Sequence, residues 1–212
     1  MKEVIKIYFG RSEILFFSFL ALLGLIYTSS SGSLIKYWYL SIIILILSPF
    51  NEYYIHKYFL HLEMPKNQGK HPFFVKFLQH IHYTHHSAPK DLNYIFAQFW
   101  LTIPGLIFDL LLAYFITGGS VQMTSVIMTA LILYYLFYEW SHFLAHSSYT
   151  PKNRYSLYMK KYHLLHHYKN ENYWYGITNP LADIIFGKFK NPETVEKSPT
   201  VKTLTGDLKD LY

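Results

Sequence analysis

Four long apolar stretches divide the chain, at roughly 14–28, 34–49, 95–116 and 121–143. A helix that crosses a lipid bilayer needs about 20 mainly apolar residues. The last two stretches reach that length alone, whereas the first two need their flanking residues. The pattern therefore predicts four membrane-spanning helices, at about 12–31, 34–52, 95–117 and 121–145.

The connectors between these stretches predict how the helices are oriented. Residues 29–33 and 117–120 carry no charge, whereas Lys and Arg lie near the start, in the 51–93 loop and after Pro151. Because the distribution of Lys and Arg sets membrane orientation, we expect both termini and the 51–93 loop to be cytoplasmic. Residues 1–33 also resemble a signal peptide, but cleavage there would leave the 51–93 loop on the same side.

The segments outside the four spans predict a helical cap. Pro72 is placed to begin a helix, and the apolar positions Phe73, Phe74, Phe77, Leu78 and Ile81 recur on one face of it. Residues 155–170 predict a second helix. We expect residues 1–190 to form one membrane domain, with a cytoplasmic cap from 53–93 and 147–190. Residues 191–212 are expected to form a loose polar tail. The predicted fold class is an all-α integral membrane protein.

The composition agrees with a membrane protein. Charged residues make up 15% of the chain, against about 25% in a typical soluble domain. The net charge is +6, but the chain has no basic run of the kind that binds nucleic acid, so we exclude nucleic acid as a partner. The absence of cysteine excludes disulfides, iron–sulfur clusters and thiolate metal sites.

Ten of the twelve histidines fall into four tight groups. These are His56 with His61, His82 with His85 and His86, His142 with His146, and His163 with His166 and His167. Residues three and four apart share a helix face, so most members of each group point the same way. His56 and His61 are five apart and point about 140° from each other on an ideal helix. That pair requires a local distortion, or one member is not a direct ligand; His56 is the less certain of the two.

The four groups are also expected at one membrane level. At about 1.5 Å per residue, the distance from Val121 to His142 is close to the thickness of the hydrocarbon core. Clustered imidazoles without a metal would repel one another on protonation and leave polar atoms without partners. We therefore predict that the ten histidines are metal ligands, and because ten are too many for one ion, we predict two metals.

Imidazole suits zinc, iron, copper and nickel. Zinc is redox-inert, and a catalytic zinc site needs only three protein ligands. Ten imidazoles facing acyl chains instead favour two irons that activate dioxygen to attack an unactivated C–H bond. Zinc recovered from purified protein would be explained by substitution during expression.

At these residues the chain resembles the membrane fatty acid hydroxylase and sterol desaturase superfamily, and within it the fatty acid 2-hydroxylases. The matching motifs are Glu52-Tyr53 with His56-Lys57 and His61; His82, His85-His86, Pro89 and Asp91; Tyr138-Glu139 with His142 and His146; and YHLLHHYKN (162–170) with Tyr175-Gly176-Ile177-Thr178 and Asp183 to Gly187. The resemblance implies four membrane helices under a cytoplasmic cap, a histidine-bound dinuclear metal centre, and dioxygen-dependent hydroxylation or desaturation of a lipid.

The chain departs from that family in two respects. Tyr94 stands where an arginine often follows the aspartate of the second motif, and the b-type haem domain fused to many members is missing. No G-x-G-x-x-G motif is present either. We therefore expect electrons to come from a separate donor, such as a b-type cytochrome, a ferredoxin or a reductase.

Several residues beyond the histidines are candidates for supporting roles. Asp91, Glu139 and Asp183 are expected to orient ligand imidazoles by accepting their second N–H, with helix capping as the alternative. Asp109 lies inside the third span, where a charge is costly; we expect it to have a structural partner or to be protonated.

The functional hypothesis is insertion of one oxygen atom into a lipid acyl chain, at C2 if the resemblance to 2-hydroxylases holds. One alternative keeps the metals but acts on a sterol, carotenoid or alkyl-ether lipid, as a hydroxylase or desaturase. Another is a non-catalytic membrane protein that binds or transports metal, which predicts ligands spread along a path across the bilayer.

Overall fold

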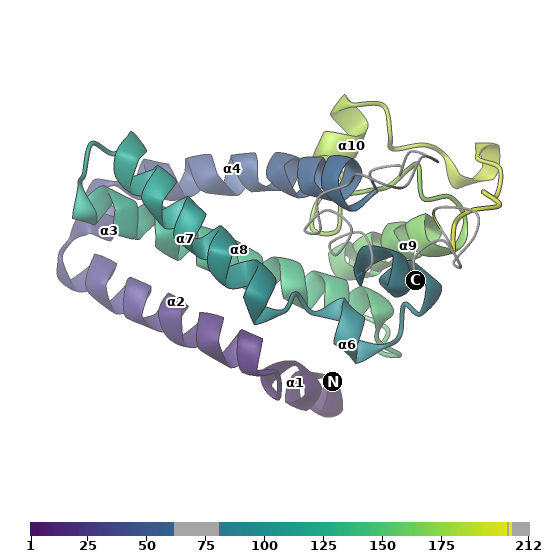
Figure 1. Ribbon diagram of the computed structural model, residues 1–212, viewed down its shortest axis with the longest axis horizontal. Helices are drawn as coiled ribbons and strands as arrows, with labels where there is room; N and C mark the ends of the chain where they lie inside the picture. Colours follow the sequence, from purple (N-terminus) through teal and green to yellow (C-terminus); the bar gives the residue numbers. More distant parts are fainter. Residues whose placement is uncertain (62–80, 203, 205–212) are drawn as a thin grey trace, which may run out of the picture. The chain divides into compact units, whose positions relative to one another are not determined.

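The computed structural model describes residues 1–61, 81–202 and 204, and within these the secondary structure is entirely helical (Figure 1). The longer helices are α1 (Lys2–Phe9), α2 (Ser12–Ser30), α4 (Trp38–Tyr54), α7 (Phe99–Ile116), α8 (Val121–His146) and α9 (Arg154–Tyr168). Short helices are α3 (Ser33–Lys36), α6 (Leu92–Ile95) and α10 (Leu181–Ile185), with a 3-10 turn at Pro192–Thr194. Residues 81–87 are also helical. The predicted interfacial helix around Phe73, Phe74, Phe77 and Leu78 lies outside the described residues.

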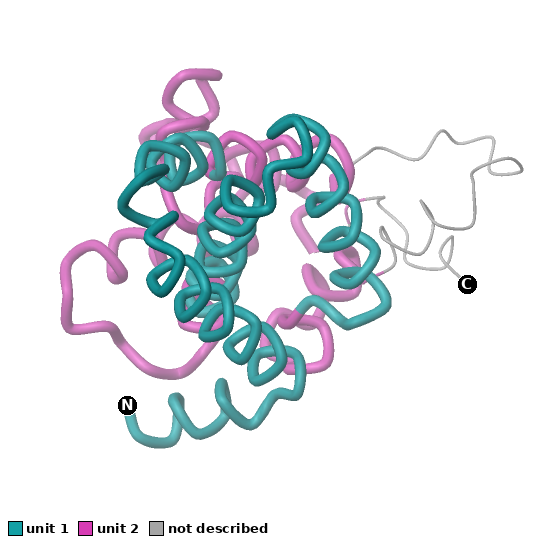
Figure 2. The backbone as a smooth tube through the Cα atoms, turned by 90° about the vertical axis from the view of Figure 1, so that its left-hand side faces the viewer, with its two compact units in different colours: residues 1–48, 97–140 teal, residues 49–96, 141–212 magenta. Residues whose placement is uncertain are grey.

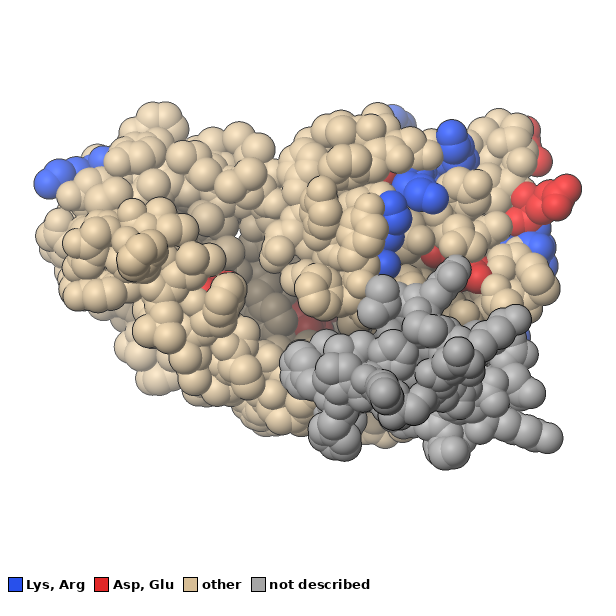
Figure 3. Space-filling view, turned by 45° about the horizontal axis from the view of Figure 1, so that its top comes forward, with Lys and Arg blue, Asp and Glu red and all other residues tan. Residues whose placement is uncertain are grey.

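Four of the helical stretches are long and apolar enough to cross a membrane. They are Ser12–Ser30, Trp38–Leu60, Leu92–Ile116 and Val121–His146. Their outer surfaces carry large apolar side chains, such as Phe108, Phe115 and Ile116 on α7, that are 64–84% exposed. The face in Figure 3 accordingly shows wide areas without charged residues. Such surfaces suit lipid rather than water, and the predicted all-α fold with four spanning helices is confirmed.

The chain forms two compact units, drawn in different colours in Figure 2. The first comprises residues 1–48 and 97–140, and the second comprises 49–96 and 141–212. In the first unit, Phe17 and Ala21 of α2 pack on Ile132 of α8. Gly24 allows close approach of these helices, because a Cβ there would lie 2.4 Å from the Thr129 hydroxyl.

The second unit contains every described histidine. Its packed centre includes Tyr53 from α4, Tyr175 from the loop after α9, and Ala182 from α10. The N-terminus of α9 is fixed by Asn153, whose side chain accepts the N–H of Ser156 at 2.7 Å. This cap sets the register of the helix that carries His163, His166 and His167.

The first part of the expected loose tail is tied to the rest of the second unit. Ser198 donates its backbone N–H to Lys169 (2.8 Å), and Asn170 donates from its side chain to the Glu196 carbonyl (3.1 Å). Val201 is 3% exposed. The backbone of residues 196–198 is therefore hydrogen-bonded to the end of α9, a contact that the polar composition of this segment does not predict.

Candidate metal centre

The end of α4 explains how His56 and His61 face each other despite their spacing. Residues Ile55–Leu60 form a π-helix, in which hydrogen bonds join residues five apart. The N–H of His61 donates to the carbonyl of His56 at 3.1 Å, and the two ring centroids are 5.0 Å apart. Of the two alternatives that the spacing left open, a local distortion or an indirect role for one member, the structure contains the distortion, as a π-turn.

Four separate parts of the second unit bring the ten histidines together. They are the π-turn, the helical segment 81–87, the last two turns of α8, and α9. The imidazoles form two groups of five. The first histidine group is His56, His61, His82, His86 and His166, and the second histidine group is His85, His142, His146, His163 and His167.

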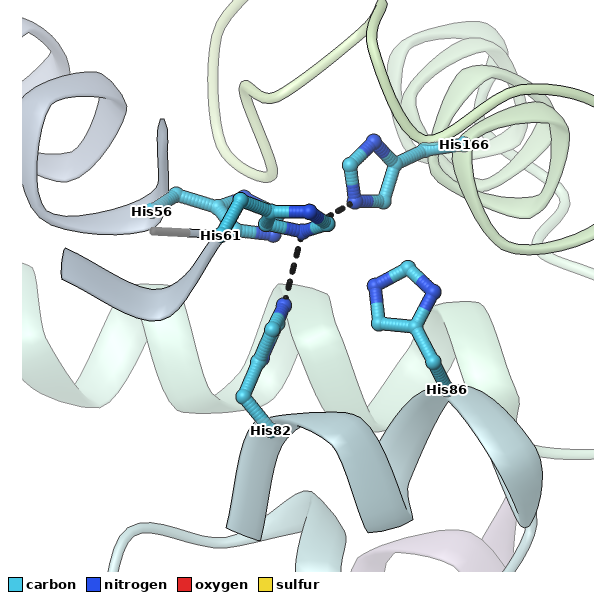
Figure 4. Close-up of side chains that lie close together, drawn as sticks. All are labelled: His56, His61, His82, His86 and His166. Atoms are coloured by element: carbon cyan, nitrogen blue, oxygen red, sulfur yellow. Dashed lines mark hydrogen bonds between the residues drawn. The ribbon is translucent and has the colours of Figure 1, made fainter. Parts of the chain in front are cut away.

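In the first histidine group the rings turn toward His61 (Figure 4). The Nε2 atom of His61 lies 2.8 Å from Nε2 of His82 and 3.1 Å from Nε2 of His166. One ring nitrogen from each member lies within 4.8 Å of the others. Only His61 is half-buried, while the other four are buried.

The second histidine group has the same character and is buried throughout. His85 Nε2 lies 3.0 Å from His142 Nε2 and 3.1 Å from His146 Nε2. His146 Nε2 is also 2.8 Å from His163 Nε2. Its candidate ligand atoms likewise lie within 4.8 Å of one another.

The two His-His pairs connect the groups. His85 belongs to the second group and His86 to the first, and His166 and His167 are divided in the same way. Consecutive residues on a helix point about 100° apart, so one pair can serve two adjacent sites. The rings of His86 and His167 stack with centroids 4.0 Å apart, which places the two groups side by side.

Backbone carbonyls fix the orientation of four of the rings. Nδ1 of His56 lies 2.6 Å from the Tyr175 carbonyl oxygen, and Nδ1 of His166 lies 2.8 Å from that of Tyr173. Nδ1 of His86 lies 3.1 Å from the Val201 carbonyl oxygen, and Nδ1 of His142 lies 3.0 Å from that of Ile95. A carbonyl only accepts, so Nδ1 carries the proton in each of these rings. In the neutral ring Nε2 then presents a lone pair, which is the form a metal requires.

Two buried carboxylates hold the loop that supplies the first two carbonyls. Asp183 accepts the N–H of Tyr175 (3.0 Å) and of Gly176 (2.6 Å). Glu52 accepts the N–H groups of Ile177 and Thr178 and the Thr178 hydroxyl. The loop is thereby positioned against His56 and His166.

Burial keeps these imidazoles neutral. Removal from water, reinforced by neighbouring imidazoles, holds the pKa of His61, His82 and His163 well below 6.5. The same causes lower the pKa of His85, His86, His166 and His167. Burial also raises the pKa of Asp183 to about 6, against the lowering effect of its two N–H donors.

The donor set fits metal ions. The Nε2 atoms of His56 and His86 and both ring nitrogens of His167 are buried without a hydrogen-bond partner among the described residues. Where Nδ1 donates to a carbonyl, as in His142 and His166, the Nε2 lone pair points at another imidazole. Converging lone pairs are satisfied by cations, and imidazole suits first-row transition metals.

The three carboxylates expected to contact imidazoles have other partners. Asp91 caps α6 by accepting the N–H of Asn93 (3.0 Å). Glu139, in the first unit, accepts the N–H of Ala97 (3.2 Å). Asp183 binds the 175–176 backbone, so it reaches His56 only through the Tyr175 carbonyl.

Asp109, the carboxylate expected inside the third span, lies in the first unit. Asp109 and Tyr135 line a cavity of about 180 Å³ together with Phe17 and Thr102. Trp100 donates its indole N–H to Gln98 (2.6 Å), and Phe99 packs edge-on against Phe16.

Comparison with known proteins agrees with this arrangement. The family model described as fatty acid hydroxylase matches residues 41–188. The ceramide very long chain fatty acid hydroxylase of Schizosaccharomyces pombe is 31% identical over 64% of this chain and 38% of its own length. The fatty acid 2-hydroxylase of Mus musculus is 26% identical over 65% of this chain and 36% of its own length.

A solved structure gives an independent comparison of the fold. The hydroxylase domain visible in the structure of full-length scs7p superposes with a TM-score of 0.68, at 20% identity, over 84% of this chain and 68% of that one. The family match extends over most of the chain and includes all ten grouped histidines. The chain belongs to the fatty acid hydroxylase family. The part matched is little more than a third of the yeast and mouse relatives.

Proposed function

We propose that the chain is a dioxygen-dependent hydroxylase of lipid acyl chains, with two irons held by the ten grouped histidines. The observation that carries the proposal is the convergence of ten imidazoles in two groups of five, in a member of the fatty acid hydroxylase family. The first histidine group would hold one ion and the second histidine group the other.

The side chains provide a preorganised, dry donor set. Carbonyls on Nδ1 keep the rings of His56, His86 and His166 aimed inward. Burial lowers the pKa of His86 and of His166 and so keeps these two rings neutral. When bound, the irons would supply the redox chemistry that activates dioxygen. The overall reaction would convert a C–H bond and dioxygen to an alcohol and water, consuming two electrons and two protons.

The substrate and carbon are proposed from the relatives. Those in fission yeast and mouse are described as a ceramide very long chain fatty acid hydroxylase and a fatty acid 2-hydroxylase. We propose an acyl chain of a ceramide-like lipid or fatty acid as the substrate here, with C2 as the site of oxidation. The two electrons would come from a partner of the b-type cytochrome, ferredoxin or reductase class.

The arrangement favours this function over metal transport. A transporter would need ligands distributed along a path, whereas the ten histidines gather in two adjoining groups within one unit. We also propose that both termini and the histidine groups are cytoplasmic, because Lys and Arg are concentrated in those segments.

The experiment is co-expression with a reductase system, followed by mass spectrometry of cellular lipids for 2-hydroxy acyl chains. The wild-type chain should produce them. The double variant His163→Ala with His166→Ala removes one ring from each group and should reduce the product by at least about 100-fold.

Lys161→Ala is the matched control, because its exposed side chain lies on the same helix. It should retain the wild-type product level. Equal product from the double variant would disprove the catalytic role of the histidines, and product hydroxylated elsewhere would disprove the assignment to C2.

A further inference from the structure

The end of α9 binds a segment that follows it by some thirty residues in the chain. Lys169 accepts the N–H of Ser198 through its carbonyl and donates from Nζ to the Pro192 carbonyl. Asn170 donates to the Glu196 carbonyl. We call residues 198–201 the C-terminal strap.

Glu171 is the side chain that fixes the C-terminal strap. Its Oε1 atom accepts the hydroxyl of Ser198 (2.8 Å) and the hydroxyl of Thr200 (2.6 Å). The Glu171 side chain is 6% exposed. Hydrogen bonds to a buried carboxylate are stronger than those between neutral groups, so one oxygen holds both ends of the turn 198–200.

The residue after this turn reaches the metal-binding region. The carbonyl of Val201 accepts from Nδ1 of His86 at 3.1 Å. His86 belongs to the first histidine group and stacks on His167 of the second. The contact fixes the tautomer of His86 and leaves Nε2 as its ligand atom.

We propose that Glu171 is a positioning residue for the first histidine group, acting through the C-terminal strap and the Val201 carbonyl on His86. Every residue has a backbone carbonyl, so the residue type at position 201 does not by itself place this acceptor. The sequence therefore specifies its position through the residues that anchor the strap, which are Glu171, Ser198 and Thr200. The inference rests on the proposed metal-binding function of the histidine groups.

The test measures binding of Co²⁺ to metal-free full-length protein in detergent, by visible absorption and by metal content per chain. The wild-type chain should bind two ions. Glu171→Ala removes both hydroxyl contacts. It should lower the affinity for one of the two ions by about tenfold or more, as loss of a hydrogen-bond partner of a ligand imidazole does. The second ion should bind as in the wild type.

Two variants sharpen the result. Glu171→Gln retains the acceptor oxygen without the charge and should restore binding close to that of the wild type. Glu196→Ala is the matched control, because Glu196 lies two residues before the C-terminal strap and its side chain is exposed. It should leave both ions unchanged.

The outcomes separate the strap from the proposed function. A wild-type chain that binds no Co²⁺ would overturn the metal-binding function itself. If the wild type and Glu171→Ala bind both ions equally tightly, the proposed role of the C-terminal strap is wrong, while the metal-binding function stands. The same holds if Glu171→Ala binds both ions more weakly to the same degree and has a lower melting temperature. Should Glu171→Ala fail to fold, Thr200→Val removes one of the two hydroxyl contacts; it should weaken one ion several-fold, and unchanged binding would overturn the proposal.

Discussion

Gly176 occupies a position in the second unit where no larger side chain fits. Its N–H lies 2.6 Å from an Asp183 oxygen, and a Cβ at this position would lie only 2.3 Å from the Asn179 carbonyl oxygen. The neighbouring Tyr175 carbonyl accepts from His56. The absence of a side chain here therefore helps to determine where the His56 ring is held.

Gly176→Ala should displace this loop and weaken the hold on His56. The overpacked backbone should cost about 1–3 kcal/mol of folding free energy, and metal bound by the first histidine group should be lost preferentially. Thermal unfolding and metal content per chain measure the two effects. Gly105→Ala is the control, because a Cβ placed there would meet no heavy atom of the described residues within 4 Å other than its own helix backbone and chain neighbours. Equal behaviour of the two variants would contradict the prediction.

The lowered pKa values of the histidines predict how metal retention depends on pH. Burial holds the pKa of His61, His82 and His163 well below 6.5 in the folded chain, whereas unfolded histidine takes up protons near 6.5. As the pH falls below about 6.5, the unfolded state binds more protons and the fold loses stability. Above pH 6.5 the rings are neutral in the folded chain and able to bind metal, so metal should be retained until the pH lies below 6.5.

Metal content after desalting at successively lower pH measures this behaviour. We expect half of the metal to be released at a pH below 6.5. The free energy of unfolding should also decrease as the pH is lowered. Release with a midpoint at or above 6.5 would mean that the imidazoles are solvated like those of an open chain.

At the scale of the elements, Lys160 joins the end of α8 to α9. Its Nζ donates to the carbonyls of Leu144 (3.0 Å), Ser147 (2.6 Å) and Tyr149 (2.8 Å). An ammonium has three donors, and the C-terminus of a helix favours a positive charge. Lys160 therefore fixes the helix end that carries His146 to the helix that carries His163.

Lys160→Met keeps the aliphatic stem and removes the three donors. The freed carbonyls should fray the end of α8, lowering stability by about 1 kcal/mol and raising amide hydrogen exchange at residues 143–147. Lys161→Met, at an exposed position on α9, should change neither quantity. Unaltered exchange in Lys160→Met would show that the helix end is held by other contacts.

The sequence predicts the four spanning helices and α9, but not the short helices or the contacts that connect the elements. Apolar length predicts the four spanning helices. The five-residue spacing of His56 and His61 leaves either a local distortion or an indirect role for one of them, and the structure contains a distortion, a π-turn. The spacing of the histidines identified all ten that gather in the two groups, though not how they divide.

The partners of the imidazoles were not predictable in the same way. The acceptors are backbone carbonyls of Ile95, Tyr173, Tyr175 and Val201, which have no signature in residue type. In the sequence Glu52 stands out only as part of a family motif. Its role depends on a contact with Thr178 that is 126 residues away in the chain, and no local pattern reveals such a contact.

At the scale of the whole molecule, the orientation in the membrane can be tested directly because the chain has no cysteine. Ser31 follows α2 and Lys152 precedes α9, and both are exposed. In single-cysteine variants, Ser31→Cys should react with a membrane-impermeant maleimide in intact cells, whereas Lys152→Cys should react only after lysis. Labelling of both from the same side would contradict the proposed orientation.

The positions of the grouped histidines along the chain determine when each group can form during biosynthesis. His61 meets His166 across 105 residues, and His86 meets the Val201 carbonyl across 115. A chain emerging from the ribosome from its N-terminus presents His56 and His61 long before their partners exist. Neither histidine group is complete until α9 has been made, and His86 receives its carbonyl only near the end of translation. Under the proposed metal-binding function, metal loading would therefore be a late step that follows synthesis of all four membrane helices.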